Sequence, residues 1–469
     1  MNAVEKLTAA FADVPPRPPL RILSATGQLG YGIIEAAFLA GLERDPHVIA
    51  ADMGSIDPGP AYLGSGQMAT TPDITRRDLR MALIAARQRN VPLLIGSAGT
   101  AGTASQLNAV IEIVRDIARQ ENLSFRLASI GADMPVDRIV AAIEANQVTP
   151  IGAIEPLSPG AVENADHIVG QMGCEAFQRA LTAGAEVIIA GRACDTAPFA
   201  AVPAYLGFPM GPAMHMAKII ECASICCVPG GRDAMLGTLD DDGFELESMN
   251  PARRATPASV AAHSLYEQAD PFSVAEPEGV LHTDMASYRA IDNRRVRVDG
   301  AEWVAAQRPS VKIEGAERLG ARAVLLAAAA DAGFIQNVDA ILTAVEATAR
   351  DIVPVDPATP YQLHFRKYGL DGVVAWTAVA DHPPRELFLL GECVASTAEQ
   401  ARAVLGVVRQ HLLHHGFDGR ISTGGNLAFP LTPPELDAGS AYRFSIYHIM
   451  QLDHATELET LFPVHIEDL

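Results

Sequence analysis

The segment VIIAGRACDTAPFA, residues 187–200, leaves an apolar run and then presents Arg192, Cys194 and Asp195 in close succession. A guanidinium held at a strand end can bind a carboxylate through two parallel hydrogen bonds, so Arg192 is a candidate for binding an anionic substrate. The alternative is a structural ion pair with Asp195 or another acid. Cys194 is either a nucleophile or, as we favour, a buried packing residue.

Other acids stand where they could move protons. Asp52 and Asp57 flank the loop MGSIDPGP, where they would act as a general base or metal ligands, or stabilise a turn. Glu221 lies in the apolar segment KIIECAS, where burial would raise its pKa; the alternative is an ion pair with Lys218 or Arg232. The candidate catalytic residues are therefore Asp52, Asp195 and Glu221.

Two glycine-rich turns follow predicted strands. The loop IGSAGTAGTAS, residues 95–105, leads into a helix whose free N–H groups could hold an anion. The turn TGQLGYG, residues 26–32, has GxxGxG spacing rather than the dinucleotide-binding GxGxxG, although Asp52 follows the next strand as a ribose-binding acid would. A late loop, ISTGGNLAFPLTPP, could close over a site or contact a neighbouring subunit. The candidate substrate-binding residues are Ser97, Gly99, Thr100, Arg192 and Asn426.

The histidines do not indicate a metal site. They are scattered and form neither an HExxH nor an HxH pair, and the six cysteines show no CxxC spacing. We therefore predict no bound metal, and the sequence identifies no cofactor. Among the histidines, His263 and His448 are the candidates for cleft residues.

These residues are positioned by alternating strands and helices. Apolar runs separated by segments of helical spacing predict a doubly wound, mostly parallel α/β sheet over residues 1–228. In such sheets the ligand site lies beyond the carboxyl ends of the strands. Mixed hairpins, helices and an alternating strand predict an α+β region over residues 229–469, which would complete the cleft or an oligomer interface. The predicted strands are 20–25, 47–52, 91–96, 125–131, 149–154 and 185–191.

Composition limits the classes of partner. The chain of 469 residues is 49% hydrophobic, as a globular protein is, and its formal net charge is −21. That charge opposes phosphate backbones and anionic membranes, so we predict no nucleic-acid or membrane partner. The sequence shows no export signal or long apolar span, and we expect a cytoplasmic protein with reduced thiols. Alanine-rich surfaces and few aromatic residues favour a homo-oligomer.

Several motifs together resemble the acyclic terpene utilisation (AtuA-type) family of bacterial catabolic proteins. They are GSAGTAG, GRACDTA, IIECAS, MNPARRATPASVAAHSLYE, GGNLAFP and FSIYHIM, and the resemblance covers nearly the whole chain. It implies a role in the breakdown of citronellol-like acids, and more generally an enzyme that acts on an organic acid or its thioester.

The residues and the resemblance lead to one main hypothesis. A small or branched carboxylate, or its acyl thioester, would be held by Arg192 and the glycine loop while an acid moves a proton α to the carbonyl. The enzyme would be a hydro-lyase or an isomerase. The alternatives are a nucleotide- or CoA-dependent enzyme and a non-catalytic subunit of a catabolic complex.

Overall fold

The computed structural model describes residues 1–12, 16–266, 270–374 and 384–469. These residues form two compact units. The first contains Met1–Glu317 and Phe444–Leu469, and the second contains Arg318–Arg443.

A ten-stranded sheet forms the centre of the first unit, in the order β14-β15-β10-β9-β1-β2-β3-β7-β4-β21. Its five middle strands are parallel to one another, which confirms the predicted α/β sheet. They are β1 (Leu20–Ser24), β2 (Val48–Asp52), β3 (Leu93–Gly96), β7 (Val187–Ala190) and β4 (Arg126–Ile130).

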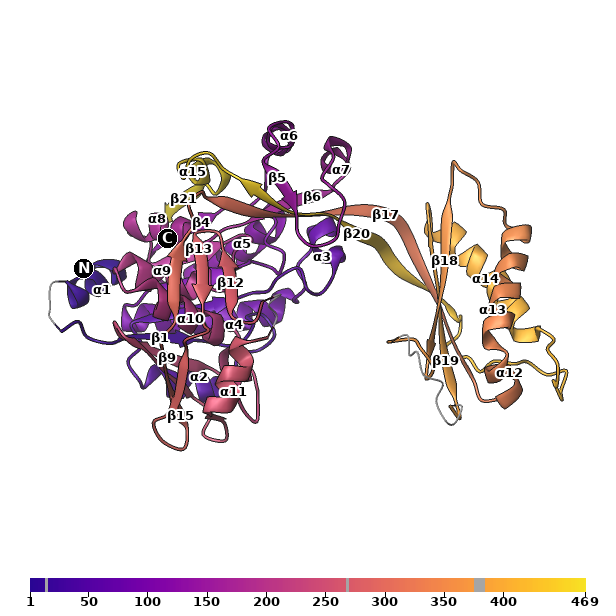
Figure 1. The fold of residues 1–469 in the computed structure, drawn as a ribbon, viewed down its shortest axis with the longest axis horizontal. Coiled ribbons are helices and arrows are strands. Elements are labelled where there is room, and N and C mark those ends of the chain that lie inside the picture. The colour runs from indigo at the N-terminus through magenta and orange to yellow at the C-terminus, as the bar shows by residue number, and fades with distance from the viewer. Residues whose placement is uncertain (13–15, 267–269, 375–383) are drawn as a thin grey trace. The chain divides into compact units, whose positions relative to one another are not determined.

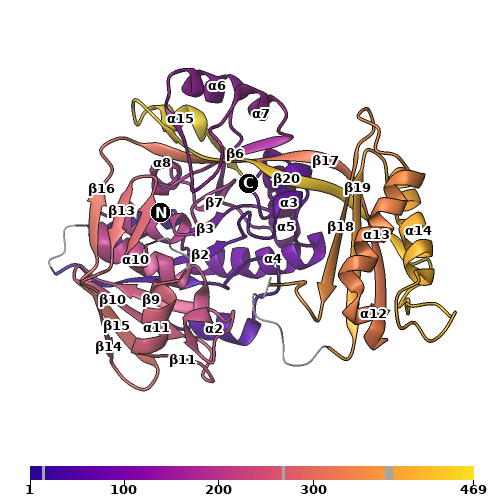
Figure 2. The ribbon, with the colours of Figure 1, turned by 45° about the vertical axis from the view of Figure 1, so that its right-hand side comes forward.

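Helices cover both faces of this sheet. Alternate residues of each strand point to opposite sides, so each strand contributes side chains to a core on either face. Ile49 packs into one core with α2 (Glu35–Leu42), α4 (Pro72–Arg89) and α5 (Ala104–Glu121). Its neighbour Val48 packs into the other core, whose helices are α8 (Cys174–Thr182), α9 (Ala197–Tyr205) and α10 (Met210–Ile220). Figure 2 shows β2, β3 and β7 between α4 and α5 on one side and α8 and α10 on the other.

Antiparallel strands extend the sheet at both edges. β9 (Met235–Leu239) pairs with β1, and β10 (Gly243–Ser248), β15 (Arg295–Asp299) and β14 (Ser287–Ala290) follow, so that β9 with β10 and β14 with β15 form two antiparallel hairpins. β21 (Val464–Asp468) pairs with β4 at the other edge. Whereas we expected a domain boundary near residue 228, the chain beyond that residue continues the same sheet, and the units divide at residues 317/318 and 443/444.

One predicted strand lies elsewhere. The run 149–154 contributes only to β5 (Val148–Pro150), which pairs with β20 (Glu435–Gln451) and not with the parallel sheet. A strand that we did not predict, β6 (His167–Gln171), pairs with β17 (Ser310–Ala329). The remaining elements of the first unit are α1 (Ala3–Phe11), α3 (Pro60–Ser65), α6 (Val136–Glu144), α7 (Pro159–Glu163), a 3-10 turn (Ala223–Cys226), β8 (Cys227–Val228), β11 (Arg254–Ala255), α11 (Pro257–Ser264), β12 (Ser273–Glu276), β13 (Gly279–His282), β16 (Glu302–Ala305) and α15 (Glu457–Leu461).

The second unit is a small α+β structure. β18 (Tyr361–Tyr368) and β19 (Leu387–Ala395) form an antiparallel sheet with β17, and α12 (Ala332–Gln336), α13 (Val338–Ile352) and α14 (Ala398–His414) supply the helices. Leu325, Val345 and Val404 belong to its core, so α13 and α14 bury one face of the sheet. Figure 1 shows both helices on the same side of β18 and β19.

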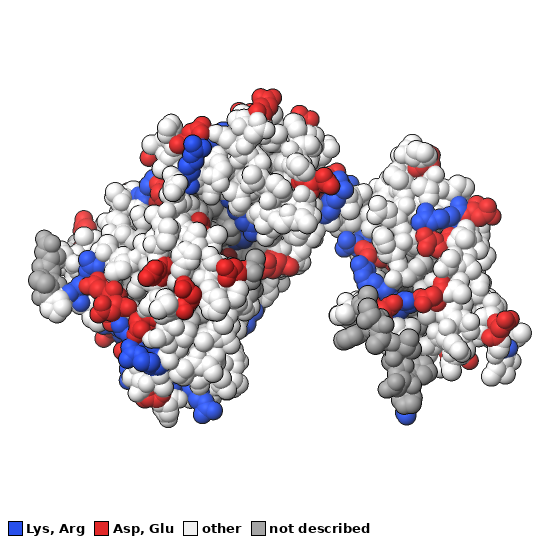
Figure 3. All heavy atoms as spheres, in the orientation of Figure 1, with Lys and Arg blue, Asp and Glu red and all other residues white. Residues whose placement is uncertain are grey.

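The surface charges are mixed. On the face drawn in Figure 3, Lys and Arg side chains are interspersed with Asp and Glu. Among the described residues, every helix is too short or too polar to cross a bilayer.

Candidate active site

Two cavities lie in the first unit, where β2 and β7 end. The first, which we call the acidic cavity, has a volume of about 440 Å³ and is lined by Asp52, Asp57, Asp195 and Glu221. The second, the cationic cavity, has a volume of about 590 Å³ and is lined by Arg192 and Lys312. Asp57 lines both cavities, so they are neighbours.

Asp52 is the last residue of β2, and its side chain is 6% exposed. Its Oδ2 accepts a hydrogen bond from the Gly54 N–H at 2.6 Å, whereas its Oδ1 is buried without a hydrogen-bond partner among the described residues. Burial and then the charge of Asp195 raise the pKa of Asp52 well above its usual value, against the opposing effect of Arg192. A buried carboxyl group with a raised pKa is a candidate general acid or base.

The structure brings the other two predicted catalytic acids into the same cavity. Asp195 follows β7, its Oδ1 lies 3.4 Å from Nη1 of Arg192, and burial raises its pKa. Glu221 follows the last residue of α10 and is buried, with its Oε1 3.5 Å from Nζ of Lys218. Carboxylates from two strand ends and one helix end therefore surround one space, although their catalytic roles stay a prediction.

Arg192 is 3% exposed, and its guanidinium group makes several hydrogen bonds within the protein. Its Nε donates to Oε2 of Glu314 at 2.9 Å, and its Nη1 donates to Oγ of Ser97 at 3.2 Å and to the Ala193 carbonyl at 2.7 Å. Burial lowers the pKa of Arg192, but the charges of Glu314 and Asp195 outweigh burial and raise it. Its Nη2 donates to no residue in the described part of the chain, and Arg192 lines the cationic cavity.

Glu314 and Lys312 are functional candidates that sequence reasoning missed. Oε1 of Glu314 lies 3.0 Å from Nζ of Lys312, and that Nζ lies 4.3 Å from the centre of the Tyr447 ring. Burial raises the pKa of Glu314, but Arg192 and Lys312 together lower it below its usual value. Glu314 thus joins the two cations of the cationic cavity into one buried cluster. In the local sequence, the only indication of this cluster is the segment VKIEG, where two opposite charges interrupt an apolar strand.

His448, which we predicted as a cleft residue, lines the cationic cavity. Its Nδ1 accepts a hydrogen bond from the Tyr447 N–H at 3.0 Å, so its Nε2 donates to the Glu155 carbonyl at 3.1 Å. Burial lowers the pKa of His448. The ring is therefore a neutral part of the wall that positions the 154–158 segment.

The glycine loop supports Arg192 and does not line either cavity. Ser97, Gly99 and Thr100 are fully buried, and the N–H groups of Ala101 and Thr103 donate to the side chain of Gln106. A Cβ atom at Gly102 would lie 2.1 Å from the backbone nitrogen of Arg192, so only glycine allows this close approach of the two backbones. Ser97 contacts the side chain of Arg192, but in the described part of the chain no residue of the loop lines either cavity.

The turn at residues 26–32 is filled by the protein itself. The buried Asp78 of α4 accepts hydrogen bonds from the N–H groups of Gly30, Gly32 and Ile33 at 3.0, 2.9 and 2.8 Å. Asp78 thus occupies the position that a phosphate would need, which argues against a nucleotide bound to this turn.

Asn426 and Cys194 lie in settings of a different kind. Asn426 belongs to the second unit, where its side-chain amide donates to the carbonyls of Leu412 and His415 and closes the end of α14. Cys194 is buried, and burial followed by the charges of Glu276 and Glu278 raises its pKa well above the usual value. A thiol in that state is a poor nucleophile, which agrees with a packing role.

In a comparison with protein families, residues 48–242 match the acyclic terpene utilisation family protein AtuA. No curated protein and no solved structure matches the chain. The matched segment contains Asp52, Arg192, Asp195 and Glu221, whereas Lys312 and Glu314 lie outside it. Over residues 48–242 the chain is therefore similar to the acyclic terpene utilisation family.

Proposed function

We propose that the chain is a catabolic enzyme that moves a proton α to the carboxyl or thioester carbonyl of a small or branched organic acid. The reaction would be a hydration, a dehydration or an isomerisation. The observation that carries the proposal is Asp52, a buried carboxyl group with a raised pKa that lines the acidic cavity and whose Oδ1 has no hydrogen-bond partner among the described residues. The family match supports a catabolic setting.

The neighbouring cations supply a place for the anionic end of the substrate. Arg192 and Lys312 line the cationic cavity, and Glu314 forms ion pairs with both side chains. A carboxylate or thioester oxygen bound there would gain charge as the α-proton leaves, and fixed positive groups stabilise such charge. Because Asp57 lines both cavities, a single substrate can extend from one cavity into the other.

In the proposed reaction, ionised Asp52 takes the α-proton, and the electron pair of the C–H bond moves toward the carbonyl oxygen. In a dehydration, Asp195 or Glu221 gives a proton to the departing hydroxyl group, and a C=C bond forms while water leaves. In an isomerisation, the proton returns to a different carbon. The carboxylates of the acidic cavity thus provide both a base and an acid.

Hydrogen–deuterium exchange at the α-carbon tests this function directly. We would incubate the full chain in D₂O with small and branched hydroxy acids, their unsaturated counterparts and their CoA thioesters, and follow the α-proton by NMR. At least one compound is expected to exchange. Asp52→Asn should slow exchange about 10²–10⁴-fold, the usual contribution of a general base.

Asp73→Asn is the matched control, because Asp73 is an exposed residue in the first turn of α4. It should exchange like the wild type. Exchange at the wild-type rate in Asp52→Asn, or no exchange with any compound of the panel, would overturn the proposal.

A further inference from the structure

We propose that Glu221, Cys222 and His263 form a binding site for a divalent transition-metal ion of the zinc class, at the edge of the acidic cavity. This inference does not depend on the proposed proton transfer, because it concerns binding and not turnover. It reverses our expectation from the sequence, where the histidine spacing indicated no metal.

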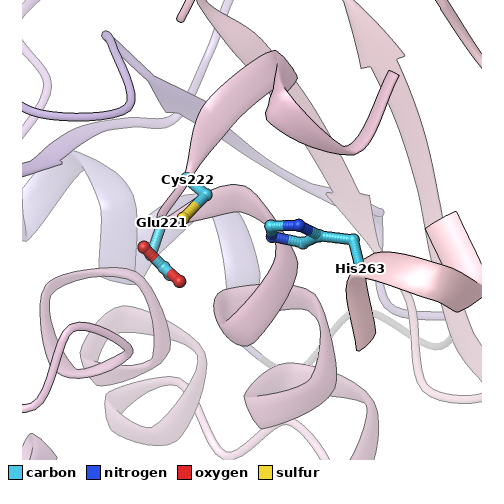
Figure 4. Close-up of side chains that lie close together, drawn as sticks. All are labelled: Glu221, Cys222 and His263. Carbon is cyan, nitrogen blue, oxygen red and sulfur yellow. The ribbon is translucent and has the colours of Figure 1, made fainter. Parts of the chain in front are cut away.

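The three side chains meet because two helices end near one another. Glu221 and Cys222 follow α10, and His263 lies in the last turn of α11. One ligand atom from each residue lies within 4.8 Å of the other two. Figure 4 shows the imidazole ring pointing toward Cys222 and Glu221. A glycine helps to form this corner, since a Cβ atom at Gly27 would lie 2.8 Å from the Cys222 carbonyl oxygen.

His263 provides a second, independent observation. The residue is 7% exposed, and its Nε2 has no hydrogen-bond partner among the described residues. The ring stacks against Tyr266 with a centroid distance of 4.8 Å, which fixes its plane. A buried nitrogen without a partner is costly, and a metal ion at the corner would satisfy it.

The donor atoms decide the class of metal. Thiolate sulfur and imidazole nitrogen favour zinc and similar ions, whereas magnesium and calcium prefer oxygen ligands alone. Around a tetrahedral zinc ion, bonds of about 2.0–2.3 Å place neighbouring ligand atoms roughly 3.5 Å apart. Contraction of the corner by about 1 Å would therefore complete the site.

A nucleophilic pair of Cys222 and His263 is the competing explanation. Such a pair needs the imidazole within hydrogen-bond reach of the thiol. Nε2 of His263 instead has no hydrogen-bond partner among the described residues, and Sγ of Cys222 lies 3.5 Å from the hydroxyl oxygen of Tyr266.

The surroundings leave room for an exogenous ligand. Glu221 and Cys222 line the acidic cavity, so a coordination position beyond the three protein ligands would face Asp52 and Asp195. Three protein ligands with one open position are typical of catalytic zinc. Lys218 lies 3.5 Å from Oε1 of Glu221, and a carboxylate has enough lone pairs to serve a lysine and a metal together.

Cobalt titration tests the site without any substrate. The full chain would be treated with a chelator and titrated with Co²⁺, which reports thiolate ligation through a sulfur-to-cobalt charge-transfer band. We expect one equivalent to bind with this band and Zn²⁺, but not Mg²⁺, to displace it. Failure to observe the band, or displacement by Mg²⁺ at similar concentrations, would contradict the proposal.

Variants assign the ligands. Cys222→Ser should remove the charge-transfer band, and His263→Gln and Glu221→Gln should each weaken Co²⁺ binding about tenfold or more. Cys393→Ser, at a buried cysteine of the second unit, is the control and should keep the band. A band that survives in Cys222→Ser would exclude this site. If Cys222→Ser does not fold by circular dichroism, the two other variants decide the assignment.

Metal binding and proton transfer can fail separately. Wild-type Co²⁺ binding in Asp52→Asn, together with lost deuterium exchange, would support both proposals. Deuterium exchange in a chain that binds no Co²⁺ would support only the proposed function.

Discussion

Arg192 and Glu314 form a buried ion pair, with Nε of the arginine 2.9 Å from Oε2 of the glutamate. The two residues come from the end of β7 and from β17, which are far apart in sequence. Glu314 also contacts Lys312, so one fully buried carboxylate compensates two cations beside the cationic cavity. Removing its charge would leave Lys312 without an anionic partner among the described residues, and Arg192 with only its longer contact to Asp195.

We therefore expect Glu314→Gln to lower the free energy of unfolding by about 3–5 kcal/mol, the usual cost of breaking a buried pair from one side. Urea unfolding followed by circular dichroism measures the change. Asp468→Asn, which breaks the exposed pair between Arg126 and Asp468, should have almost no effect. Equal effects of the two substitutions would show that Glu314 is not needed to hold the cations.

Measurements of substrate binding should show whether Arg192 or Cys194 is the residue that the site needs. Arg192→Lys is expected to weaken the binding of a carboxylate ligand by about 2 kcal/mol, because lysine cannot make the fixed contacts of a guanidinium. Cys194→Ala should change it little, since burial holds that thiol protonated. Isothermal titration calorimetry with a compound from the exchange panel measures both. Lost turnover in Cys194→Ala with retained turnover in Arg192→Lys would instead indicate a thiol mechanism.

Glu276 should make stability depend on pH. Burial raises its pKa from the usual 4.5 to about 7, and its Oε1 accepts a hydrogen bond from Thr196. Because the folded state favours the protonated form, this contribution to stability is complete below pH 4.5 and is lost as the pH rises through 7. Glu276→Gln should therefore reduce the decline in the free energy of unfolding between pH 4.5 and pH 7.

Denaturant unfolding at a series of pH values measures this slope. Glu302→Gln, at an exposed residue of β16, is the control and should retain the wild-type profile. A Glu276→Gln profile that is parallel to the wild type would mean that other groups cause the decline.

Asp78 should be important for stability although it lines neither the acidic nor the cationic cavity. Asp78→Ala would leave the N–H groups of Gly30, Gly32 and Ile33 without their acceptor, and we expect a loss of more than about 2 kcal/mol. Thermal unfolding compared with Asp73→Ala, an exposed acid of the same helix, provides the measurement and the control. Similar melting temperatures for the two variants would show that water replaces the carboxylate at no cost.

The sequence by itself determined the parallel sheet and the acids at its edge. Strand and helix periodicity depends on residues close in the chain, so the strands that contain Ile22, Val48 and Ile188 were predictable. The rule that polar groups after parallel strands share one edge then placed Asp52 and Asp195 together. Both steps require only local pattern and a general rule of topology.

Tertiary structure alone decided which groups those residues meet. Glu314 reaches Arg192, Asp78 fills the first glycine turn and His263 reaches Cys222, and each contact joins segments that are distant in sequence. The run at 149–154 was misplaced for the same reason, because its partner β20 lies near the end of the chain. Such pairings depend on strand order and register, which follow from packing of the whole core and not from the residues on either side.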